Sequence, residues 1–270
     1  MTENKKENPL EKAKSGLPVS KDEQMLAINA ASNNYYYTDD QIFDDKLKAW
    51  VIEKALEFLK PGRILDLGYI NSIWTKALLS VPGVEAVDIV GAAPSHVEQA
   101  RADFAGEKRV RIFHTLFEEF TPDHPYDTIL MSGVVKHVPD DDALVTRAKS
   151  WLAPDGVVIA STPNCRAFHR RLGTYMGLES SPCTHSARDH SVFNVRLYDR
   201  YSWRALFVRN GYQVGPVHGI GMKLLSTPQM IHLGTKYDIN GILEGLRSMA
   251  EEMPDYAWYL LLTAKAGTAD

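Results

Sequence analysis

Short apolar segments alternate with amphipathic ones between residues 39 and 161, and this alternation constrains the fold more than any other feature of the chain. Apolar runs bounded by glycine, proline or polar turns are typical of buried strands. We expect such strands at 63–68, 84–90, 110–114, 126–131 and 157–161. Apolar side chains that recur every three or four residues predict helices at 39–59, 71–80, 95–104 and 140–152. Alternating strands and helices of this kind predict an α/β fold with a doubly wound, mostly parallel sheet.

The alternation stops after Pro163. Helices are expected at 165–176 and 201–210, with an irregular polar stretch between them, and 227–249 is expected to be helical in parts. Two later strands, at 212–217 and 258–263, are expected to pair antiparallel at one edge of the sheet. We therefore expect the second half of the chain to form a C-terminal cap over the open end of the sheet, where ligands of such sheets bind.

Composition changes along the chain suggest four regions. Residues 1–22 are rich in Lys, Glu, Asn and Pro, and a segment with so few apolar side chains cannot offset its ordering entropy by burial. We expect a disordered tail at 1–22, a Rossmann-like cofactor-binding core at 23–165, a cap or substrate region at 166–250, and a final strand and tail at 251–270.

Charge and cysteine content exclude several classes of function. The 30 Lys and Arg residues stand against 34 Asp and Glu, a net charge of −4, so a broad nucleic-acid or membrane surface is not expected. The sequence has neither a signal-like apolar segment near its start nor an apolar run long enough to span a bilayer, so we expect a soluble, cytoplasmic protein. Cys165 and Cys183 are expected to be free thiols. Their spacing to His169, His185 and His190 does not fit a zinc site, and no metal is expected.

Three segments carry a family resemblance. They are Arg63-Ile-Leu-Asp-Leu-Gly68, the stretch from Tyr126 to Val138, which ends in Val-Val-Lys-His-Val, and Trp151-Leu-Ala-Pro-Asp-Gly-Val-Val-Ile-Ala160. In this order and spacing, they resemble the class I S-adenosylmethionine-dependent methyltransferases over roughly residues 40–165. Pro163-Asn164, 168–173 and 196–199 are similar to a subgroup that acts on small molecules. The resemblance implies a Rossmann-like methyltransferase fold and S-adenosyl-L-methionine as cofactor.

The resemblance also implies where the cofactor binds. The glycine turn after the first strand lets the backbone approach the ligand, and residues after the second, third and fourth strands face the ribose, the adenine and the methionine end. Asp66 is expected to hold the methionine ammonium. Tyr69 and Asn71 either replace lost glycine contacts or close the pocket with their bulk. The expected cofactor-binding residues are Asp66, Gly68, Tyr69, Asn71, Gly91, Leu116, Phe117, Ser132 and Gly133.

The chain departs from the family pattern at several of these positions. The expected G-x-G-x-G is Gly68-Tyr-Ile-Asn-Ser72, so only the first glycine remains. The position of the ribose-binding acid falls on Gly91, while Asp88 lies three residues earlier, inside the strand. The adenine-contact position falls near Leu116, and a glutamate of the fourth loop is Lys136. The losses therefore affect cofactor contacts and leave the strands intact.

Candidate residues for chemistry lie after the fourth strand and in the cap. His137 and His169 are candidate catalytic bases, because an imidazole titrates near neutral pH. Tyr36, Arg170, Arg171 and Lys223 are candidate substrate-binding residues, since arginines on one helix can bind a carboxylate or phosphate. Each has a structural alternative: a histidine bonded to a neighbouring loop, a solvated basic face, or an aromatic cluster at a helix entry.

The sequence thus favours a methyltransferase that acts on a small molecule by in-line transfer of a methyl group, with an anionic substrate left open. Two alternatives stay open: a degenerate homologue that acts as a non-catalytic partner or scaffold, and another reaction in the same pocket, such as aminocarboxypropyl transfer or a cyclisation. A nicotinamide-dependent dehydrogenase is disfavoured because residue 70 is isoleucine where its glycine motif needs a second glycine. A homodimer or a partner enzyme is left open.

Overall fold

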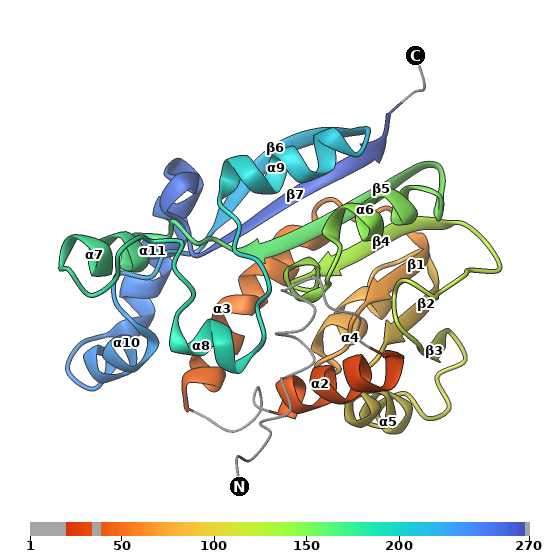
Figure 1. The fold of residues 1–270 in the computed structure, drawn as a ribbon, viewed down its shortest axis with the longest axis horizontal. Helices are drawn as coiled ribbons and strands as arrows, with labels where there is room; N and C mark the ends of the chain where they lie inside the picture. Colours follow the sequence, from red (N-terminus) through yellow and green to blue (C-terminus); the bar gives the residue numbers. More distant parts are fainter. Residues whose placement is uncertain (1–19, 34–38, 268–270) are drawn as a thin grey trace, which may run out of the picture.

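A seven-stranded sheet forms the centre of the computed structural model, which describes residues 20–33 and 39–267 (Figure 1). The strand order is β3-β2-β1-β4-β5-β7-β6. Neighbouring strands from β3 to β5 are parallel, and β7 runs antiparallel to both β5 and β6. The strands are β1 (Gly62–Leu67), β2 (Val84–Gly91), β3 (Val110–His114), β4 (Tyr126–Ser132), β5 (Leu152–Pro163), β6 (Tyr212–Ile220) and β7 (Tyr259–Ala266).

Helices cover both faces of this sheet. Successive side chains of a strand point to opposite faces, so Ile64 of β1 packs with α3, α4, α5 and α11, whereas its neighbour Leu65 lies in the core shared with α6 and α9. The helices are α2 (Lys21–Asn33), α3 (Asp39–Leu56), α4 (Ile73–Leu79), α5 (Pro94–Asp103), α6 (Asp141–Lys149), α7 (Phe168–Tyr175), α8 (Ala187–Ser191), α9 (Arg200–Arg209), α10 (Thr227–Gly234) and α11 (Ile239–Glu252), with 3₁₀ turns η1 (Val135–His137) and η2 (Pro254–Tyr256).

The fold class expected from the sequence is confirmed, as is the antiparallel pair at one edge. Local signals explain several boundaries. Pro94 opens α5, and the Asp140 carboxylate accepts a hydrogen bond from the Ala143 amide at the start of α6. One boundary differs from expectation. Helix α2 begins at Lys21, inside the range expected to be a tail.

The two cysteines correct another expectation. Cys165 and Cys183 form a disulfide, with their Cα atoms 4.8 Å apart. The chain turns back on itself after α7, and this reversal brings together two residues separated by 18 positions. Free thiols were expected because a reducing cytoplasm was assumed, and the linear sequence does not show the chain reversal that joins the two residues. Because the two sulfur atoms bond to each other, neither is available as a metal ligand.

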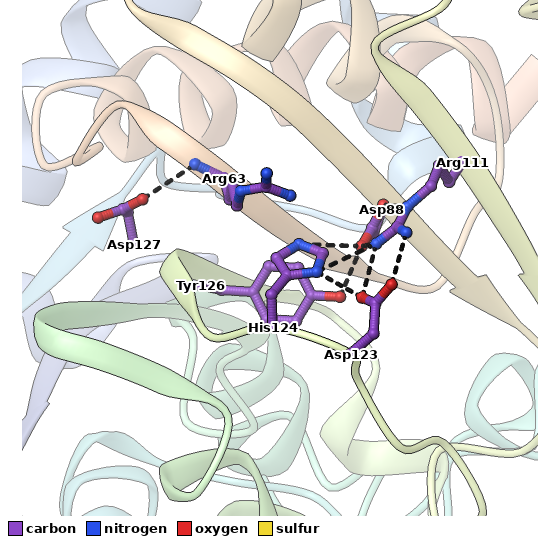
Figure 2. A network of polar contacts seen from close by, with 7 residues as sticks. All are labelled: Arg63, Asp88, Arg111, Asp123, His124, Tyr126 and Asp127. Carbon is purple, nitrogen blue, oxygen red and sulfur yellow. Dashed lines mark hydrogen bonds and ion pairs between the residues drawn. The ribbon is translucent and has the colours of Figure 1, made fainter.

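A polar network lies on β2 and β3 near the edge of the sheet (Figure 2). The Asp88 carboxylate accepts hydrogen bonds from the Arg111 guanidinium at 2.8 and 2.6 Å and from the Tyr126 hydroxyl at 2.6 Å. Arg111 also pairs with Asp123, which contacts His124. Asp88, Asp123 and His124 lie close enough together to suggest a cation site, but Arg111 already supplies the positive charge there.

None of the helices in the described ranges is both long and apolar enough to cross a membrane.

Candidate active site

A cavity opens beyond the C-terminal ends of β1, β2 and β4, where ligands of parallel sheets bind. The structure brings together residues from every loop that the sequence singled out. All nine expected cofactor residues line this cavity: Asp66, Gly68, Tyr69, Asn71, Gly91, Leu116, Phe117, Ser132 and Gly133. His137 lines it as well. The start of β7 is at the same end of the sheet, because Tyr259 pairs with Pro163 at the end of β5, and Tyr259 completes one wall.

Asp66 is the buried acid of the cavity. It is only 4% exposed, and burial raises the pKa of its carboxyl to about 7, while the nearby Thr75 hydroxyl acts to lower the pKa. No ion pair joins Asp66 to a cationic side chain of the described residues. A buried carboxyl of this kind favours an ammonium group as its ligand, because the cation would stabilise the charged form.

Two glycines at the cavity have backbone conformations that side chains rarely adopt. Gly68 has φ +91°, and a Cβ atom there would come within 2.6 Å of the Val134 Cγ1 atom. Gly133 has φ +69°. Glycine at these two turns lets the backbone come close to a ligand at the ends of β1 and β4.

Tyr69 does not close the cavity. It lies between Gly68 and Ile70, and Ile70 occupies the position of the second glycine in the family pattern. The Tyr69 hydroxyl donates to the Asp103 carboxylate of α5, and its ring packs edge-on against Phe104 at 6.3 Å between centroids. The ring is 6% exposed and belongs to the core under α3, α4 and α5. Asn71 instead serves the entry of α4, because its side-chain oxygen accepts a hydrogen bond from the Ile73 amide at 3.1 Å.

The cavity lacks polar side chains at the two positions where the family pattern supplies them. Gly91 ends β2 without a side chain, and Leu116 is apolar and 6% exposed. Asp88 does not replace the missing acid, because its carboxylate is bound by Arg111 and Tyr126 (Figure 2). The acids among the described lining residues are Asp66 and Glu118.

Sequence reasoning missed several lining residues. Glu118 follows β3, two positions after Leu116, and Lys48 of α3 is the only Lys or Arg among the described lining residues. Glu118 could have been found as an acid in the expected loop, shifted by two positions. Further lining residues are Gln24, Ile28, His96, Val192, Phe193 and Tyr259. Residues 24 and 28 of α2 are spaced at one helical turn, but the sequence gives no sign that this helix returns to the cavity.

His137 has a defined hydrogen bond at the wall of the cavity. Its Nδ1 atom lies 3.0 Å from the Phe193 carbonyl oxygen. Burial lowers the pKa of His137 to about 3, and the charge of the neighbouring Lys136 acts in the same direction. The imidazole is therefore neutral near pH 7. Since a carbonyl oxygen can only accept, Nδ1 carries the ring proton, and Nε2 keeps its lone pair.

The other candidate residues of the cap do not line the cavity. The guanidinium of Arg170 binds the Pro182 and Thr184 carbonyl oxygens and the Asp189 carboxylate, and Arg171 lies over the Tyr256 ring at 4.5 Å. Lys223 is 4% exposed and donates to Asp44 and Thr227.

His169 is also away from the lining residues. Burial lowers its pKa to about 3, with Lys223 and Arg170 adding to the effect, and its Nδ1 atom is buried without a partner in the described structure. Arg170, Arg171 and Lys223 are thus engaged within the protein, and His169 does not line the cavity. Tyr36 lies outside the described residues.

Comparisons with known proteins agree with this geometry. The pattern of the methyltransferase domain family matches residues 40–216. The ubiquinone biosynthesis O-methyltransferase of Bradyrhizobium sp. (strain ORS 278) is 30% identical over 116 residues, which are 41% of this chain and 44% of the relative. The corresponding protein of Azorhizobium caulinodans is 31% identical over 115 residues, with the same shares. The matched part is thus less than half the length of these curated relatives.

Solved structures share the fold at low sequence identity. The methyltransferase in complex with the Haloferax volcanii Trm112 methyltransferase activator has a TM-score of 0.62 and 14% identity, covering 88% of this chain and 98% of that one. The N-methyltransferase NodS of Bradyrhizobium japonicum WM9, bound to S-adenosyl-L-homocysteine, has a TM-score of 0.56 and 10% identity with the same coverage. The fold, the cavity and the family match lead to one conclusion: this chain belongs to the methyltransferase domain family and has a Rossmann-like methyltransferase fold.

Proposed function

We propose that this protein transfers the methyl group of S-adenosylmethionine to a hydroxyl group of a small, mainly apolar acceptor. One observation carries the proposal: a neutral imidazole whose Nε2 atom has no hydrogen-bond partner among the described residues lines the same cavity as a buried acid that pairs with no cationic side chain of those residues. The imidazole suits an acceptor hydroxyl, and the buried acid suits the ammonium group of the cofactor. The names of the curated relatives, which are O-methyltransferases, support a hydroxyl as the acceptor group.

Residues of the cavity fit the two charged ends of the cofactor's methionine part. Asp66 would bind the ammonium, and Lys48 would bind the carboxylate. Gly68 and Gly133 leave room for the ligand at the backbone. With Gly91 and Leu116 unable to bind the ribose and adenine through polar side chains, Glu118 is the acid left to do so. When bound, the cofactor supplies an electrophilic methyl group on a sulfonium.

His137 would act on the acceptor. Its Nε2 atom would accept the proton of the acceptor hydroxyl as that oxygen is methylated by the group that the bound cofactor would supply. The aromatic and apolar side chains of Trp74, Val192, Phe193 and Tyr259 exclude water and favour a flat, apolar acceptor. An anionic acceptor has less support, because Arg170, Arg171 and Lys223 do not line the cavity.

The alternative of a non-catalytic scaffold draws its support from Gly91 and Leu116, the two positions that lack polar side chains. The open cavity argues against it, since the side chains of Tyr69 and Leu116 do not fill it. Another transfer from the same cofactor would use the same cavity and differ in the group that moves.

Incubation with S-adenosylmethionine carrying a labelled methyl group, and with a panel of phenols, catechols and aliphatic alcohols, tests the proposal. We expect one acceptor class to gain the labelled methyl at oxygen, and His137→Gln to slow the transfer by about 100-fold. Transfer of a larger group, identified by product mass, would establish the alternative chemistry. If the purified protein bound the cofactor but transferred its methyl group only to amines or to nothing in the panel, the hydroxyl assignment would be wrong.

A further inference from the structure

Phe193 has an unusual backbone conformation next to the candidate base. Its φ is +53°, in the left-handed region that bulky residues rarely occupy. The carbonyl oxygen of this residue is the one that faces His137 Nδ1, at 3.0 Å, and its side chain lines the cavity. Such conformations persist only where the surrounding structure enforces them, and they cluster at functional sites.

Asp189 holds the segment that carries Phe193. We call residues 182–196 the strap. The Asp189 carboxylate accepts a hydrogen bond from the Asn194 side chain at 2.6 Å, and its backbone oxygen accepts from the Asn194 amide at 2.9 Å. Ser186 donates to the same carboxylate, as part of the capping box that opens α8. These contacts fix the residues on both sides of Phe193.

Arg170 of α7 lies outside the strap in sequence and binds three of its residues. Its guanidinium donates to Asp189 at 3.0 Å and to the Pro182 carbonyl oxygen at 2.7 Å, and it also binds the Thr184 carbonyl oxygen. Burial acts to raise the pKa of Asp189, but hydrogen bonds from Ser186 and the charge of Arg170 outweigh it and hold the pKa at about 2. The ion pair is therefore present throughout the neutral pH range. The disulfide between Cys183 and Cys165 ties the start of the strap to the same region.

The other end of the strap is bonded to the turn that carries the base. The Val195 and Arg196 amides both donate to the Lys136 carbonyl oxygen, at 2.8 and 3.3 Å. Lys136 is the residue before His137 in η1. Contacts of Asp189 before Phe193 and hydrogen bonds to η1 after it therefore hold this part of the strap. They direct the Phe193 carbonyl at the Nδ1 atom of His137.

We propose that Asp189 and Arg170 are positioning residues, which hold the Phe193 carbonyl on His137 and so fix the imidazole as the Nδ1–H tautomer. Nε2, which has no hydrogen-bond partner among the described residues, is then the only ring nitrogen that can accept a proton from the cavity. A carbonyl or carboxylate that orients one nitrogen of a histidine in this way is a recurring means of setting the reactive nitrogen. The consequence for catalysis rests on the proposed function, whereas the tautomer itself does not.

Nitrogen-15 NMR of the full chain with labelled histidine measures the tautomer directly. The His137 signals are assigned by their loss in His137→Gln. We expect the Nδ1–H form in the native protein and a mixture of both tautomers in Asp189→Ala, with the affinity for S-adenosylhomocysteine unchanged within about twofold. Glu107→Ala is the matched control, because Glu107 accepts hydrogen bonds from the Arg109 guanidinium between α5 and β3, away from the strap. It should leave the tautomer unchanged.

Arg170→Lys provides a second, milder test, because lysine keeps the charge beside Asp189 but cannot bind both carbonyl oxygens and the carboxylate. We expect a smaller shift in the same direction, and this variant decides the matter if circular dichroism shows that Asp189→Ala does not fold. An Nε2–H tautomer in the native protein, or a pure Nδ1–H form in the folded variants, would overturn the proposal. If the tautomer shifts but no hydroxyl is methylated, the positioning role stands and the proposed function fails.

Discussion

Two buried aspartates on neighbouring strands have opposite surroundings. Asp88 of β2 is 1% exposed and accepts hydrogen bonds from Arg111 and Tyr126, so its charge is balanced within the protein. Asp66 of β1 is 4% exposed and pairs with no cationic side chain of the described residues, and burial raises its pKa to about 7. Burying a carboxylate is costly unless it is paired. Asp88 therefore stabilises the fold, whereas Asp66 is placed to bind a cation from outside.

The largest expected effect comes from Asp66→Asn. Below about pH 3 the carboxyl is protonated in both the folded and the unfolded chain. As the pH rises, the unfolded chain, with a pKa near 3.8, loses this proton first, and the folded chain loses it near pH 7. The native protein therefore loses up to about 4 kcal/mol of unfolding free energy across this window, and the asparagine variant does not. Urea unfolding at pH 4 and pH 8 measures the difference.

The same variant should bind S-adenosylhomocysteine about 10- to 100-fold more weakly near pH 8, because it lacks the charge that would face the ammonium. Asp127→Asn is the control, since Asp127 lies at the other end of the sheet, where it accepts a hydrogen bond from the Arg63 amide. It should leave the affinity unchanged. An Asp66→Asn protein that binds the ligand as tightly as the native one would show that Asp66 has a structural role like that of Asp88.

Arg111→Met tests the other aspartate. Removing the guanidinium leaves Asp88 buried with Tyr126 as its main donor, and we expect a loss of about 2 kcal/mol of unfolding free energy, below the usual range for broken buried pairs because Arg111 is partly exposed. Ligand affinity should not change. Arg101→Met, on the exposed side of α5, should cost less than about 0.5 kcal/mol. A large loss of ligand affinity in Arg111→Met would contradict the conclusion that Asp88 has a structural role and Asp66 a ligand-binding one.

Gly91→Asp is expected to tighten cofactor binding by about 1 kcal/mol, because it restores an acid where the family resemblance places the ribose contact. The backbone tolerates a side chain there: the φ of Gly91 is not in the left-handed region, and a Cβ atom would contact only Val97, at 3.7 Å. Gly91→Ala controls for the added bulk. Isothermal titration calorimetry compares the three proteins, and weaker binding by Gly91→Asp than by Gly91→Ala would place the ribose elsewhere.

Arg171→Ala is the smallest of these changes. We expect a loss of about 0.5–1 kcal/mol of unfolding free energy, because the guanidinium stacks on Tyr256 near the protein surface. Thermal unfolding detects this change. Methyl transfer to the acceptor panel should continue at the native rate, and a raised KM for acidic acceptors alone would instead make Arg171 a substrate-binding residue.

The sheet and the cofactor end were predictable because both follow local rules. The alternation of apolar runs and helices predicts the strand positions and a parallel sheet, and parallel strands bring the loops after Asp66, Gly91 and Ser132 to one edge whatever the rest of the chain does. The fate of Tyr69 was not predictable. Whether its ring fills the cavity or packs on Phe104 depends on Asp103 of α5, which is distant in sequence.

The cap was harder to predict because its contacts are between segments without periodic patterns. An arginine pattern on α7 looks the same whether the side chains face a ligand or, as with Arg170, bind the carbonyls of a returning loop. The disulfide and the left-handed Phe193 belong to that loop as well. The residues expected to bind the cofactor therefore gather at one cavity, whereas Arg170, Arg171 and Lys223, expected to bind the acceptor, do not line it.

Calorimetric titration of the full chain with S-adenosylmethionine near pH 8 tests the central claim most directly, because it asks whether a cavity with Gly91 and Leu116 at two contact positions still holds the cofactor. We predict binding of one molecule per chain with a dissociation constant in the micromolar range. The absence of binding at millimolar concentrations of both S-adenosylmethionine and S-adenosylhomocysteine would contradict the account and favour the scaffold.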